Sequence, residues 1–216
     1  MFEHKTISLS DQVFERLEDE ILWGNYQRGD TLTEMKLVTD LGVSRTPIRD
    51  ALHRLEQERL IEITPRGILV LGVTGKDLAD IYAIRIRIEG LAAREAAKYI
   101  TDDQLAELKE TLELQEFYVG KQNPDGIKIM DSQFHSLICQ FSGSAILYDT
   151  IIPLHKKIQR YRRAAVSVNE RAQESVQEHR AIYEALVKRD SDEAEHYMVE
   201  HVRKARDYTL QQEDWL

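Results

Sequence analysis

The sequence is poor in the residues that mark extracellular and membrane proteins. Its 216 residues include a single cysteine, Cys139, so no internal disulfide can form, which is typical of a reducing cytoplasm. No apolar run approaches the ~20 residues of a transmembrane helix. The N-terminal stretch MFEHKTISLSDQ lacks the apolar segment of a signal peptide. With four prolines and 42% hydrophobic residues, the chain indicates a globular, largely helical, cytoplasmic protein with no membrane partner.

An excess of positive charge is also missing, although it is a common mark of nucleic-acid-binding proteins. The net charge is −9, and residues 1–72 contain nine Lys and Arg against thirteen Asp and Glu. The balance changes only locally, because three arginines face one acid, Asp50, between Ser44 and Arg54. Affinity for DNA must therefore come from a local arrangement of side chains and not from a global field.

Residues 40–61, DLGVSRTPIRDALHRLEQERLI, are predicted to form two helices separated by a tight turn. Gly42 suits a left-handed helix end, Ser44 suits the N-cap of the next helix, and Pro47 suits its first turn. The second helix has a stripe of apolar residues at helical spacing, which we expect to be buried. These residues are Ile48, Ala51, Leu52 and Leu55.

The second of these helices carries the donors of a DNA-recognition helix. At 3.6 residues per turn, Arg45 and Arg49 project about 40° apart beside the apolar stripe. Thr46 and His53 lie farther out on the exposed side. Base-edge donors near a helix N-terminus are typical of a helix that enters the major groove. An ordinary amphipathic helix hairpin with solvated arginines shows the same spacing, so this pattern alone is a weak signal.

The residues after this helix strengthen the interpretation. Residues 61–64 (IEIT) and 68–71 (ILVL) are predicted to form two short strands joined across residues 65–67, and residues 31–32 could add a third. A hairpin directly after a recognition helix is a wing. The stretch GVSRTPIRDALHRLEQERLIEITPRGILV resembles the winged helix-turn-helix of the GntR family of bacterial transcription regulators.

The resemblance implies a DNA interface around the recognition helix and the wing tip. It comprises Ser44, Arg45, Thr46, Arg49, Arg66 and Gly67. The same resemblance places Arg28 near the DNA backbone, although an ordinary turn residue at that position would look the same.

A glycine cluster at residues 72–75 marks the predicted domain boundary, because six of the ten glycines fall before residue 76. Residues 1–73 are predicted to form the winged helix-turn-helix domain, with three helices and a small β-hairpin wing; the first helix is capped by Ser10. Residues 74–216 are predicted to form an antiparallel all-α bundle of six helices, the fourth kinked at Pro153. The fold class is therefore mainly α.

Ionisable residues lie on the apolar stripes of three bundle helices. Asp131 and His135 are neighbours four residues apart, and His179 and His201 occupy stripe positions in the last two helices. His179 lies eleven residues before Asp190 and His201 eleven after it, so the two imidazoles stand at the same height in a hairpin that turns there. One aspartate and three histidines converging in a bundle core predict a divalent transition-metal site.

The family resemblance agrees with this prediction. The segments DSQFH, EHRAIYEAL and EHVRKA are similar to the metal-binding FCD ligand domain of the FadR subfamily, and the match gives the same four residues the role of ligands. Zinc is the first expectation from the ligand types, and nickel or manganese would suit nearly as well. His196, five residues from His201, is expected to face solvent. His155 is a weaker alternative ligand.

Arg85 is the other charged residue on a predicted core stripe. Its segment RIRIEGLAAREAA resembles the family's first bundle helix, where the corresponding arginine faces the effector cavity. A buried guanidinium needs a partner, and a bound carboxylate would supply one bidentately. Glu89, one turn on, is the alternative partner through an intrahelical salt bridge. Arg160, Arg162 and Arg163 form either a further anion contact or a solvated face.

Together these features predict a cytoplasmic, homodimeric, metal-containing transcription regulator, and not an enzyme. Its N-terminal domain would bind a palindromic double-stranded DNA operator, and its bundle would bind a small carboxylate effector over the metal and change operator affinity. Repression relieved by the effector is the commoner mode in this family, and activation stays open as the alternative. Two further alternatives stay open. A metal-dependent hydrolase lacks an obvious general base here and leaves the winged helix unexplained; the other alternative is a DNA-binding regulator with a purely structural metal.

Overall fold

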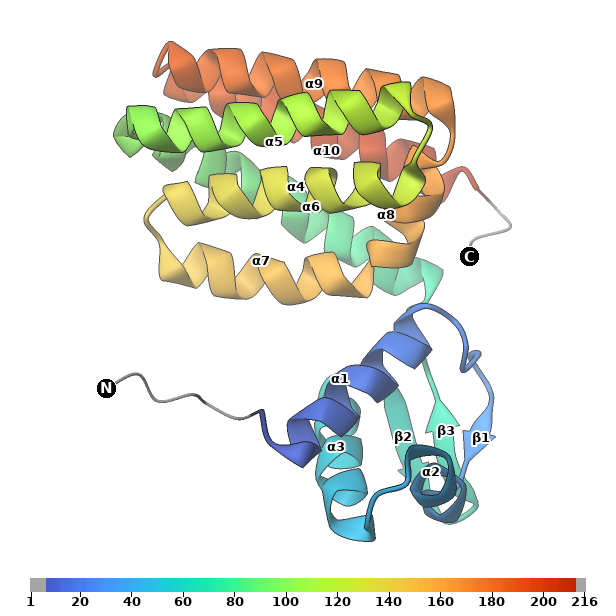
Figure 1. The fold of residues 1–216 in the computed structure, drawn as a ribbon. Helices are drawn as coiled ribbons and strands as arrows, with labels where there is room; N and C mark the ends of the chain where they lie inside the picture. Colours follow the sequence, from blue (N-terminus) through green and yellow to red (C-terminus); the bar gives the residue numbers. More distant parts are fainter. Residues whose placement is uncertain (1–6, 213–216) are drawn as a thin grey trace. The chain divides into compact units, whose positions relative to one another are not determined.

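The computed structural model describes residues 7–212, so residues 1–6 of the N-terminal stretch lie outside it. The chain divides into two compact units, Met1–Thr74 and Gly75–Leu216. The first combines helices with a small sheet, and the described part of the second is helical throughout (Figure 1). Within the described range, none of the helices combines the length and apolar character that a membrane span requires.

The first unit has the elements of a winged helix-turn-helix. Their bounds are α1 Leu9–Leu22, β1 Thr31–Leu32, α2 Glu34–Leu41, α3 Arg45–Gln57, β2 Ile61–Thr64 and β3 Gly67–Val70. The strand order is β1-β3-β2, and both pairs are antiparallel, with Thr31 opposite Leu69 and Ile61 opposite Val70. The wing hairpin and the short strand predicted at residues 31–32 are therefore confirmed.

Helix ends in this unit follow the sequence signals with two exceptions. Gly42 ends α2 at φ 67°, a left-handed conformation that glycine adopts without a Cβ clash. Ser44 occupies the N-cap of α3 as predicted, but its side chain makes no capping hydrogen bond. The predicted cap of α1 is wrong: Ser8, not Ser10, is the N-cap, because the Ser8 hydroxyl accepts a hydrogen bond from the N–H of Asp11.

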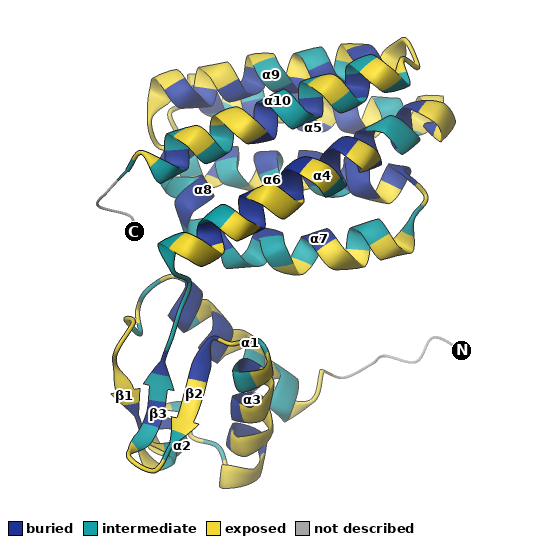
Figure 2. Cartoon of the chain, turned by 180° about the vertical axis from the view of Figure 1, so that it is seen from behind, coloured by how far each residue is buried: buried dark blue, intermediate teal, exposed yellow. Residues whose placement is uncertain are grey.

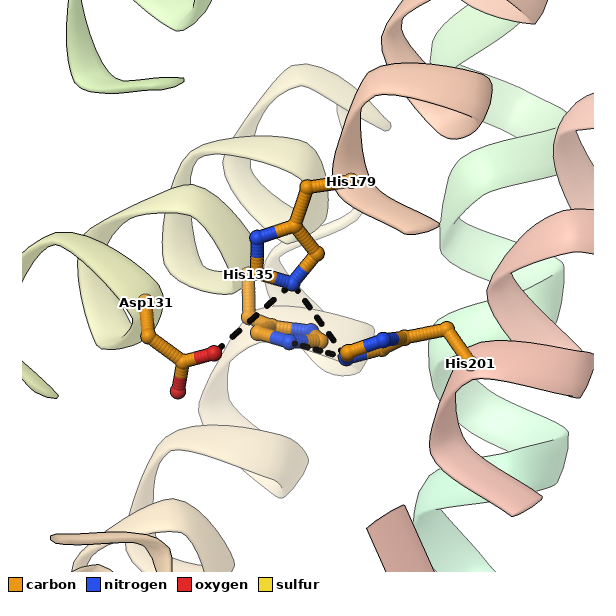
Figure 3. A group of neighbouring side chains, drawn as sticks. All are labelled: Asp131, His135, His179 and His201. Atoms are coloured by element: carbon orange, nitrogen blue, oxygen red, sulfur yellow. Dashed lines mark hydrogen bonds and ion pairs between the residues drawn. The ribbon is translucent and has the colours of Figure 1, made fainter. Parts of the chain in front are cut away.

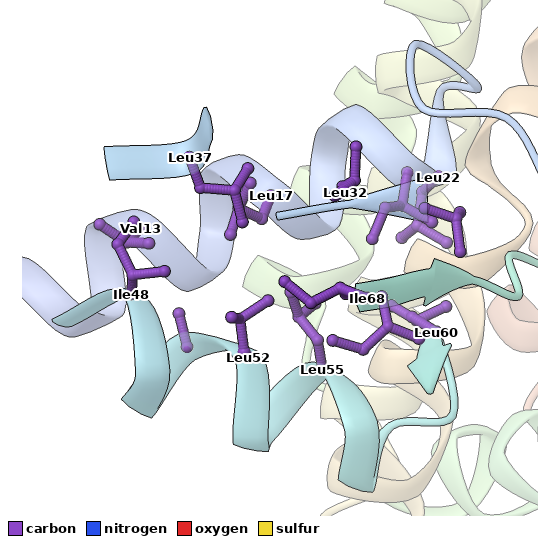
Figure 4. Close-up of a cluster of buried hydrophobic side chains, with 14 residues drawn as sticks. Val13, Leu17, Leu22, Leu32, Leu37, Ile48, Leu52, Leu55, Leu60 and Ile68 are labelled. Carbon is purple, nitrogen blue, oxygen red and sulfur yellow. The ribbon is translucent and has the colours of Figure 1, made fainter. Parts of the chain in front are cut away.

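The core cluster of the first unit consists entirely of aliphatic side chains. The three helices and the sheet contribute to it, and Figure 4 shows these side chains meeting between α1, α3 and the strands. Leu37, Ile48 and Ala51 are completely buried. Burial of a Leu or Ile side chain stabilises by about 1.5–3 kcal/mol. The predicted stripe thus fixes α3 on the core, and the helix has both buried and exposed positions (Figure 2). Arg45 and Arg49 are among the exposed ones.

The described part of the second unit contains seven helices, one more than predicted. Their bounds are α4 Gly75–Tyr99, α5 Asp102–Gly120, α6 Pro124–Phe141, α7 Ala145–Lys157, α8 Gln159–Val166, α9 Asn169–Val187 and α10 Ser191–Leu210. The fourth predicted helix is split into α7 and α8 at Ile158, while Pro153 lies inside α7. Ile158 is completely buried, so the interruption accompanies side-chain packing and not a helix-breaking residue.

The remaining helix boundaries of the bundle agree with their sequence signals. Thr101 and Gln104 form the predicted capping box at the start of α5. Asp190 caps α10 after a short turn, so α9 and α10 form the predicted hairpin. Helix α4 packs against α10, α6 and α7, and α5 packs against α6 and α9 (Figure 1). This arrangement brings α4, α6, α9 and α10 around one interior region.

Candidate DNA interface and metal centre

The predicted DNA-contacting residues cluster in three places on the first unit. Ser44, Arg45, Thr46 and Arg49 lie at the start of α3, Arg66 and Gly67 form part of the wing turn, and Arg28 lies in the turn between α1 and β1. All are exposed except Gly67, which is half-buried. The structure thus leaves these donors accessible to a macromolecular partner.

Two of the three arginines of α3, Arg45 and Arg49, contact α2. Arg49 Nε donates to both carboxylate oxygens of Glu34, at 3.0 and 3.1 Å, and Arg45 Nη2 lies 3.1 Å from the sulfur of Met35. The Arg49 pair is solvent-exposed, with 58% and 36% of the two side chains accessible. Such exposed pairs stabilise the fold by about 0–1 kcal/mol, so little free energy is lost when DNA replaces these partners of the guanidinium groups.

Two of the predicted DNA residues also have structural roles. Arg28 Nη1 donates to the carbonyl oxygen of Leu71 at 2.9 Å and so ties its turn to the end of the wing strand. Gly67 has φ 134°, and a Cβ on it would lie 2.8 Å from the carbonyl oxygen of Leu32. Glycine is therefore required at Gly67 by the packing of β1 on the wing, independently of any DNA contact.

The four residues predicted as metal ligands are brought together in the second unit. Asp131 and His135 come from α6, His179 from α9 and His201 from α10 (Figure 3). All four are buried, and one ligand atom from each lies within 4.8 Å of all the others. Helix α6 is far in sequence from the hairpin of α9 and α10, so its convergence with them depends on the tertiary fold and not on local spacing.

The imidazole rings face one another through the same nitrogen. His201 Nε2 lies 3.1 Å from His135 Nε2 and 3.2 Å from His179 Nε2. His179 Nε2 lies 3.7 Å from Asp131 Oδ1 (Figure 3). Three nitrogens and one carboxylate oxygen are thus directed at one buried point.

The opposite nitrogen of each ring lies beside an oxygen atom, as a hydrogen bond for His179 and His201 and as an ion pair for His135. His135 Nδ1 lies 2.5 Å from Glu89 Oε2, His179 Nδ1 lies 2.8 Å from Gln115 Oε1, and His201 Nδ1 lies 2.7 Å from Glu178 Oε2. Carboxylate and amide oxygens only accept hydrogen bonds, so each Nδ1 carries the proton. In a neutral ring with that tautomer, Nε2 presents a lone pair. Converging lone pairs repel one another unless a cation lies between them, so the donor set fits a metal ion.

The protonation states of the cluster agree with this donor set. Burial lowers the pKa of His135 to about 3, against the opposing charge of Glu89. Burial also places the pKa of His179 well below its usual value. Burial by itself raises the pKa of Asp131, but the guanidinium of Arg162 and then the imidazoles outweigh this effect and hold that pKa below its ordinary value. An ionised carboxylate and neutral imidazoles suit a borderline-soft divalent ion.

Arg85 is buried as predicted, and its partner is the alternative one. Its side chain is 1% exposed, and its Nε donates to Glu89 Oε1 at 2.6 Å. His155, the weaker alternative ligand, is outside the cluster, because its Nε2 lies 2.9 Å from Glu89 Oε1. His196 is exposed, as predicted. Glu89 is therefore a shared partner of Arg85, His135 and His155.

A small cavity adjoins the cluster. Its lining includes Arg85 and Arg162 together with Asp131, His135 and His201. Arg162 is 6% exposed and donates to Asp131 Oδ2 through Nε, at 3.0 Å, and through Nη2. Its third nitrogen, Nη1, is buried without a hydrogen-bond partner. A positively charged donor is thus available at the wall of this cavity.

The other two arginines of the basic cluster do not reach this cavity. Arg163 pairs with the exposed Asp125, and Arg160 Nη2 donates to the hydroxyl of Tyr161 at 2.8 Å. Only Arg162 of the three is buried. The basic cluster is therefore divided, with one member inside the bundle and two on partly exposed positions.

Sequence reasoning missed three residues that complete the site. Gln115 is completely buried and follows Leu108 and Leu112 at helical spacing, so a polar residue on a core stripe could have indicated it. Glu178 precedes His179, but nothing in its spacing points to His201. Arg162 was recognised only as one member of a basic cluster.

Comparisons with known proteins agree with both units. The model of the FCD domain matches residues 80–204, more than half of the chain, and the model of the gntR family of bacterial regulatory proteins matches residues 9–70. The chain belongs to the GntR family and carries an FCD domain. It is therefore a transcription regulator of the GntR type, whose N-terminal unit is a DNA-binding winged helix-turn-helix.

Relatives of this GntR regulator match over most of their length. YdhC of Bacillus subtilis, an uncharacterized HTH-type transcriptional regulator, is 29% identical and is covered to 86%, over 88% of this chain. The HTH-type transcriptional repressor RspR of Escherichia coli is 28% identical and covered to 94%, over 97% of this chain. The solved structure of E. coli McbR/YncC has a TM-score of 0.78 at 26% identity, covering 96% of this chain and 99% of that one.

The comparisons also decide between a regulator and an enzyme. The gntR family model describes bacterial regulatory proteins, and the relatives YdhC and RspR are named as transcriptional regulators. The metal-dependent hydrolase considered from the sequence is therefore set aside. The buried His/Asp cluster lies inside the residues that the FCD model matches, so a metal ion there would belong to the regulatory domain.

Proposed function

We propose that this GntR regulator is a homodimeric repressor of the FadR subfamily, which binds a palindromic operator and senses a small carboxylate over a divalent metal ion. RspR of E. coli and the gluconate operon repressor of Bacillus licheniformis, 30% identical over 56% of this chain, are named as repressors. Two-fold protein symmetry is the usual counterpart of a palindromic operator. The repressor assignment rests on these relatives.

For the DNA contact, we propose that α3 enters the major groove with Arg45 and Arg49 toward base edges. Both side chains are exposed, and their contacts with α2 are weak enough to exchange for DNA. The hydroxyl of Ser44 makes no capping hydrogen bond, which leaves it available to a backbone phosphate. Thr46 would lie beside it, and Arg66 and Gly67 of the wing and Arg28 would complete the contact with the DNA backbone.

For the metal, the ligands would be Asp131, His135, His179 and His201. Their Nδ1 partners fix each ring in the orientation that a bound ion requires. Zinc is the first candidate, followed by nickel and manganese. A divalent ion there would supply a Lewis-acid contact for a carboxylate oxygen.

For the effector, we propose a small carboxylate that pairs with Arg85 and Arg162 beside the ligands. The cavity of about 30 Å³ has room for little more than a water molecule, so an organic acid must displace a side chain. Arg162 is the side chain that we expect to move, because its Nη1 has no partner and its present contact is with Asp131. Effector binding would then rearrange α8 and alter operator affinity.

The convergence of three Nε2 lone pairs and one carboxylate oxygen carries this proposal, because only a cation makes it favourable. The test is elemental analysis of the purified protein, followed by a thermal-shift screen of small carboxylates on metal-loaded and chelator-treated protein. A carboxylate that raises the melting temperature only of the loaded protein supports the proposal. Metal binding without any carboxylate response would instead indicate a purely structural metal.

The oligomeric state needs its own measurement. Sedimentation at micromolar concentration should give a dimer, because two half-sites are read together. A monomer under these conditions would contradict the homodimer.

A further inference from the structure

Glu89 is a completely buried carboxylate that contacts three donors from three helices. Its Oε1 lies 2.6 Å from Arg85 Nε and 2.9 Å from His155 Nε2, and its Oε2 lies 2.5 Å from His135 Nδ1. Arg85 and Glu89 belong to α4, His135 to α6 and His155 to α7. Glu178 makes a similar bridge, from the cavity-lining Arg171 to His201 Nδ1, but its side chain is 11% exposed, whereas Glu89 is completely buried.

The two carboxylate oxygens of Glu89 face different groups: Oε1 contacts Arg85 of the cavity, and Oε2 contacts His135 of the ligand cluster. Arg85 lines the cavity, and its Nε is held by Glu89. His135 presents Nε2 to the cluster, and its Nδ1 on the opposite side of the ring is in ion-pair contact with Glu89 Oε2 at 2.5 Å. In a buried, low-dielectric region, a change in the charge balance at one contact of this carboxylate alters the other contact.

We propose that Glu89 is a positioning residue that couples anion binding at Arg85 to the strength of His135 as a metal ligand. The inference rests on the function proposed above and names how its two parts communicate. An anion bound to Arg85 partly neutralises the guanidinium. Less of the negative charge of Glu89 is then compensated by Arg85, and its interaction with His135 becomes stronger. A stronger acceptor at Nδ1–H makes Nε2 a better donor to a cation. By linkage, a cation at the cluster must strengthen anion binding by the same factor.

Gln115 provides the matched comparison. It holds His179 Nδ1 at 2.8 Å, as Glu89 holds His135, and it is equally buried. It is uncharged, however, and it is absent from the lining of the cavity. Both residues should therefore support metal affinity, whereas only Glu89 should connect that affinity to an anion.

The experiment measures zinc affinity of the full-length protein by competition with a chromophoric chelator, with and without acetate. Acetate is the probe because it is a small carboxylate and a weak chelator. We define the acetate factor as the ratio of the zinc affinity with saturating acetate to the zinc affinity without it. In the wild type this factor should be several-fold, because acetate should tighten zinc binding. Glu89→Gln should weaken zinc binding by about 10–100-fold and reduce the acetate factor below that of the wild type, to the part that a direct contact between acetate and zinc supplies. Gln115→Met should weaken zinc binding in the same way and keep the acetate factor of the wild type.

Each outcome bears on the proposal. An acetate factor in Glu89→Gln equal to that of the wild type overturns it, even if zinc affinity falls. If that variant does not fold, Glu89→Asp keeps the charge but is one methylene too short to reach Arg85 and His135 together; an unchanged acetate factor there overturns it as well. A wild type that binds no zinc refutes the function proposed above, and a wild type that binds zinc without any acetate effect refutes the coupling.

Discussion

The two units of this regulator place their candidate functional residues in opposite environments. In the first unit, the arginines proposed to contact DNA are exposed, and beneath them lies a core cluster of aliphatic residues. In the second unit, the candidate ligands and their partners are themselves the interior, with Arg85, Glu89 and His179 at most 1% exposed. A surface suits a macromolecule that arrives from outside, whereas a buried polar centre suits an ion or a small acid.

This difference determines what substitutions can reveal. An exposed ion pair contributes about 0–1 kcal/mol, so a variant on α3 should change DNA binding without changing the fold. Removing one partner from a buried ion pair costs about 3–5 kcal/mol, because the remaining charge is left without compensation. Variants in the bundle therefore change stability and ligand binding together, and they need controls that separate the two.

The largest effect is expected on operator binding, from substitution of the exposed arginines in the first unit. The double variant Arg45→Ala/Arg49→Ala should abolish specific operator binding, since a good bidentate base contact is worth about 1–3 kcal/mol and a dimer loses each contact twice. Its melting temperature should stay that of the wild type. Arg16→Ala, which removes another exposed arginine of the same unit, is the control. Unchanged operator affinity in the double variant, measured by fluorescence anisotropy, would show that α3 is not the recognition helix.

The second effect is expected on metal binding, from substitution of the buried candidate ligands in the second unit. His179→Ala or His201→Ala should remove both the metal and the response to carboxylates, while operator binding without effector stays largely intact. His196→Ala should change neither, because His196 is exposed and outside the cluster. Elemental analysis of the three purified variants is the measurement. Metal retained in both His179→Ala and His201→Ala, or a wild type that cannot be loaded, would refute the ligand assignment.

The third effect concerns pH and the metal-free protein. Burial lowers the pKa of His155 to about 4 from its ordinary value of 6.5. Between these values the unfolded chain binds the proton and the folded protein does not, so the free energy of unfolding must fall as pH drops from 6.5 toward 4. His155→Gln should lose this part of the acid sensitivity. Urea unfolding at several pH values measures it, and equal pH slopes in the two proteins would contradict it.

The fourth effect distinguishes the two units by metal removal. An ion at about 100 times its dissociation constant stabilises the folded state by about 2.7 kcal/mol. A chelator should therefore lower the unfolding temperature of the bundle by several degrees. A signal from the winged helix, such as hydrogen exchange in α3, should stay unchanged. An equal loss of protection in both units would show that the bundle alone does not hold the metal.

The smallest effect is expected at the wing tip. Arg66→Ala should weaken operator binding only mildly, because the exposed arginine would contact the backbone and not a base. The loss should be similar for specific and random DNA, and the salt dependence of binding should become less steep. A selective loss for the operator would instead assign Arg66 to base recognition.

The fold could be predicted to the extent that its signals are local. Helix periodicity, the glycine at Gly42 and the capping box at Thr101 each depend on neighbouring residues, and the structure agrees with all of them. The split at Ile158 could not be predicted, because it accompanies burial of an ordinary helix-forming side chain. The cap at Ser8 was missed because Ser8 and Ser10 carry the same chemistry two residues apart.

The candidate site shows the same limit more sharply. Helical spacing identifies a polar residue on a core stripe, and that was enough to bring Asp131, His135, His179 and His201 into one group. It does not tell which residue of another helix lies opposite. The partners Gln115 and Glu178 come from helices other than those of the histidines they hold, so only the fold reveals them.

The short strand β1 has a consequence for how the DNA-reading surface forms. Thr31 pairs with Leu69, so this two-residue strand closes a long loop of chain that contains all of α2 and α3. Closing such a loop requires contacts between distant residues, which form later than local helices. Helix α3 therefore lies within the loop of chain that this strand pairing closes. Separating the wing strands would remove this constraint from α3 as well. The wing and α3 are therefore expected to fold and unfold cooperatively.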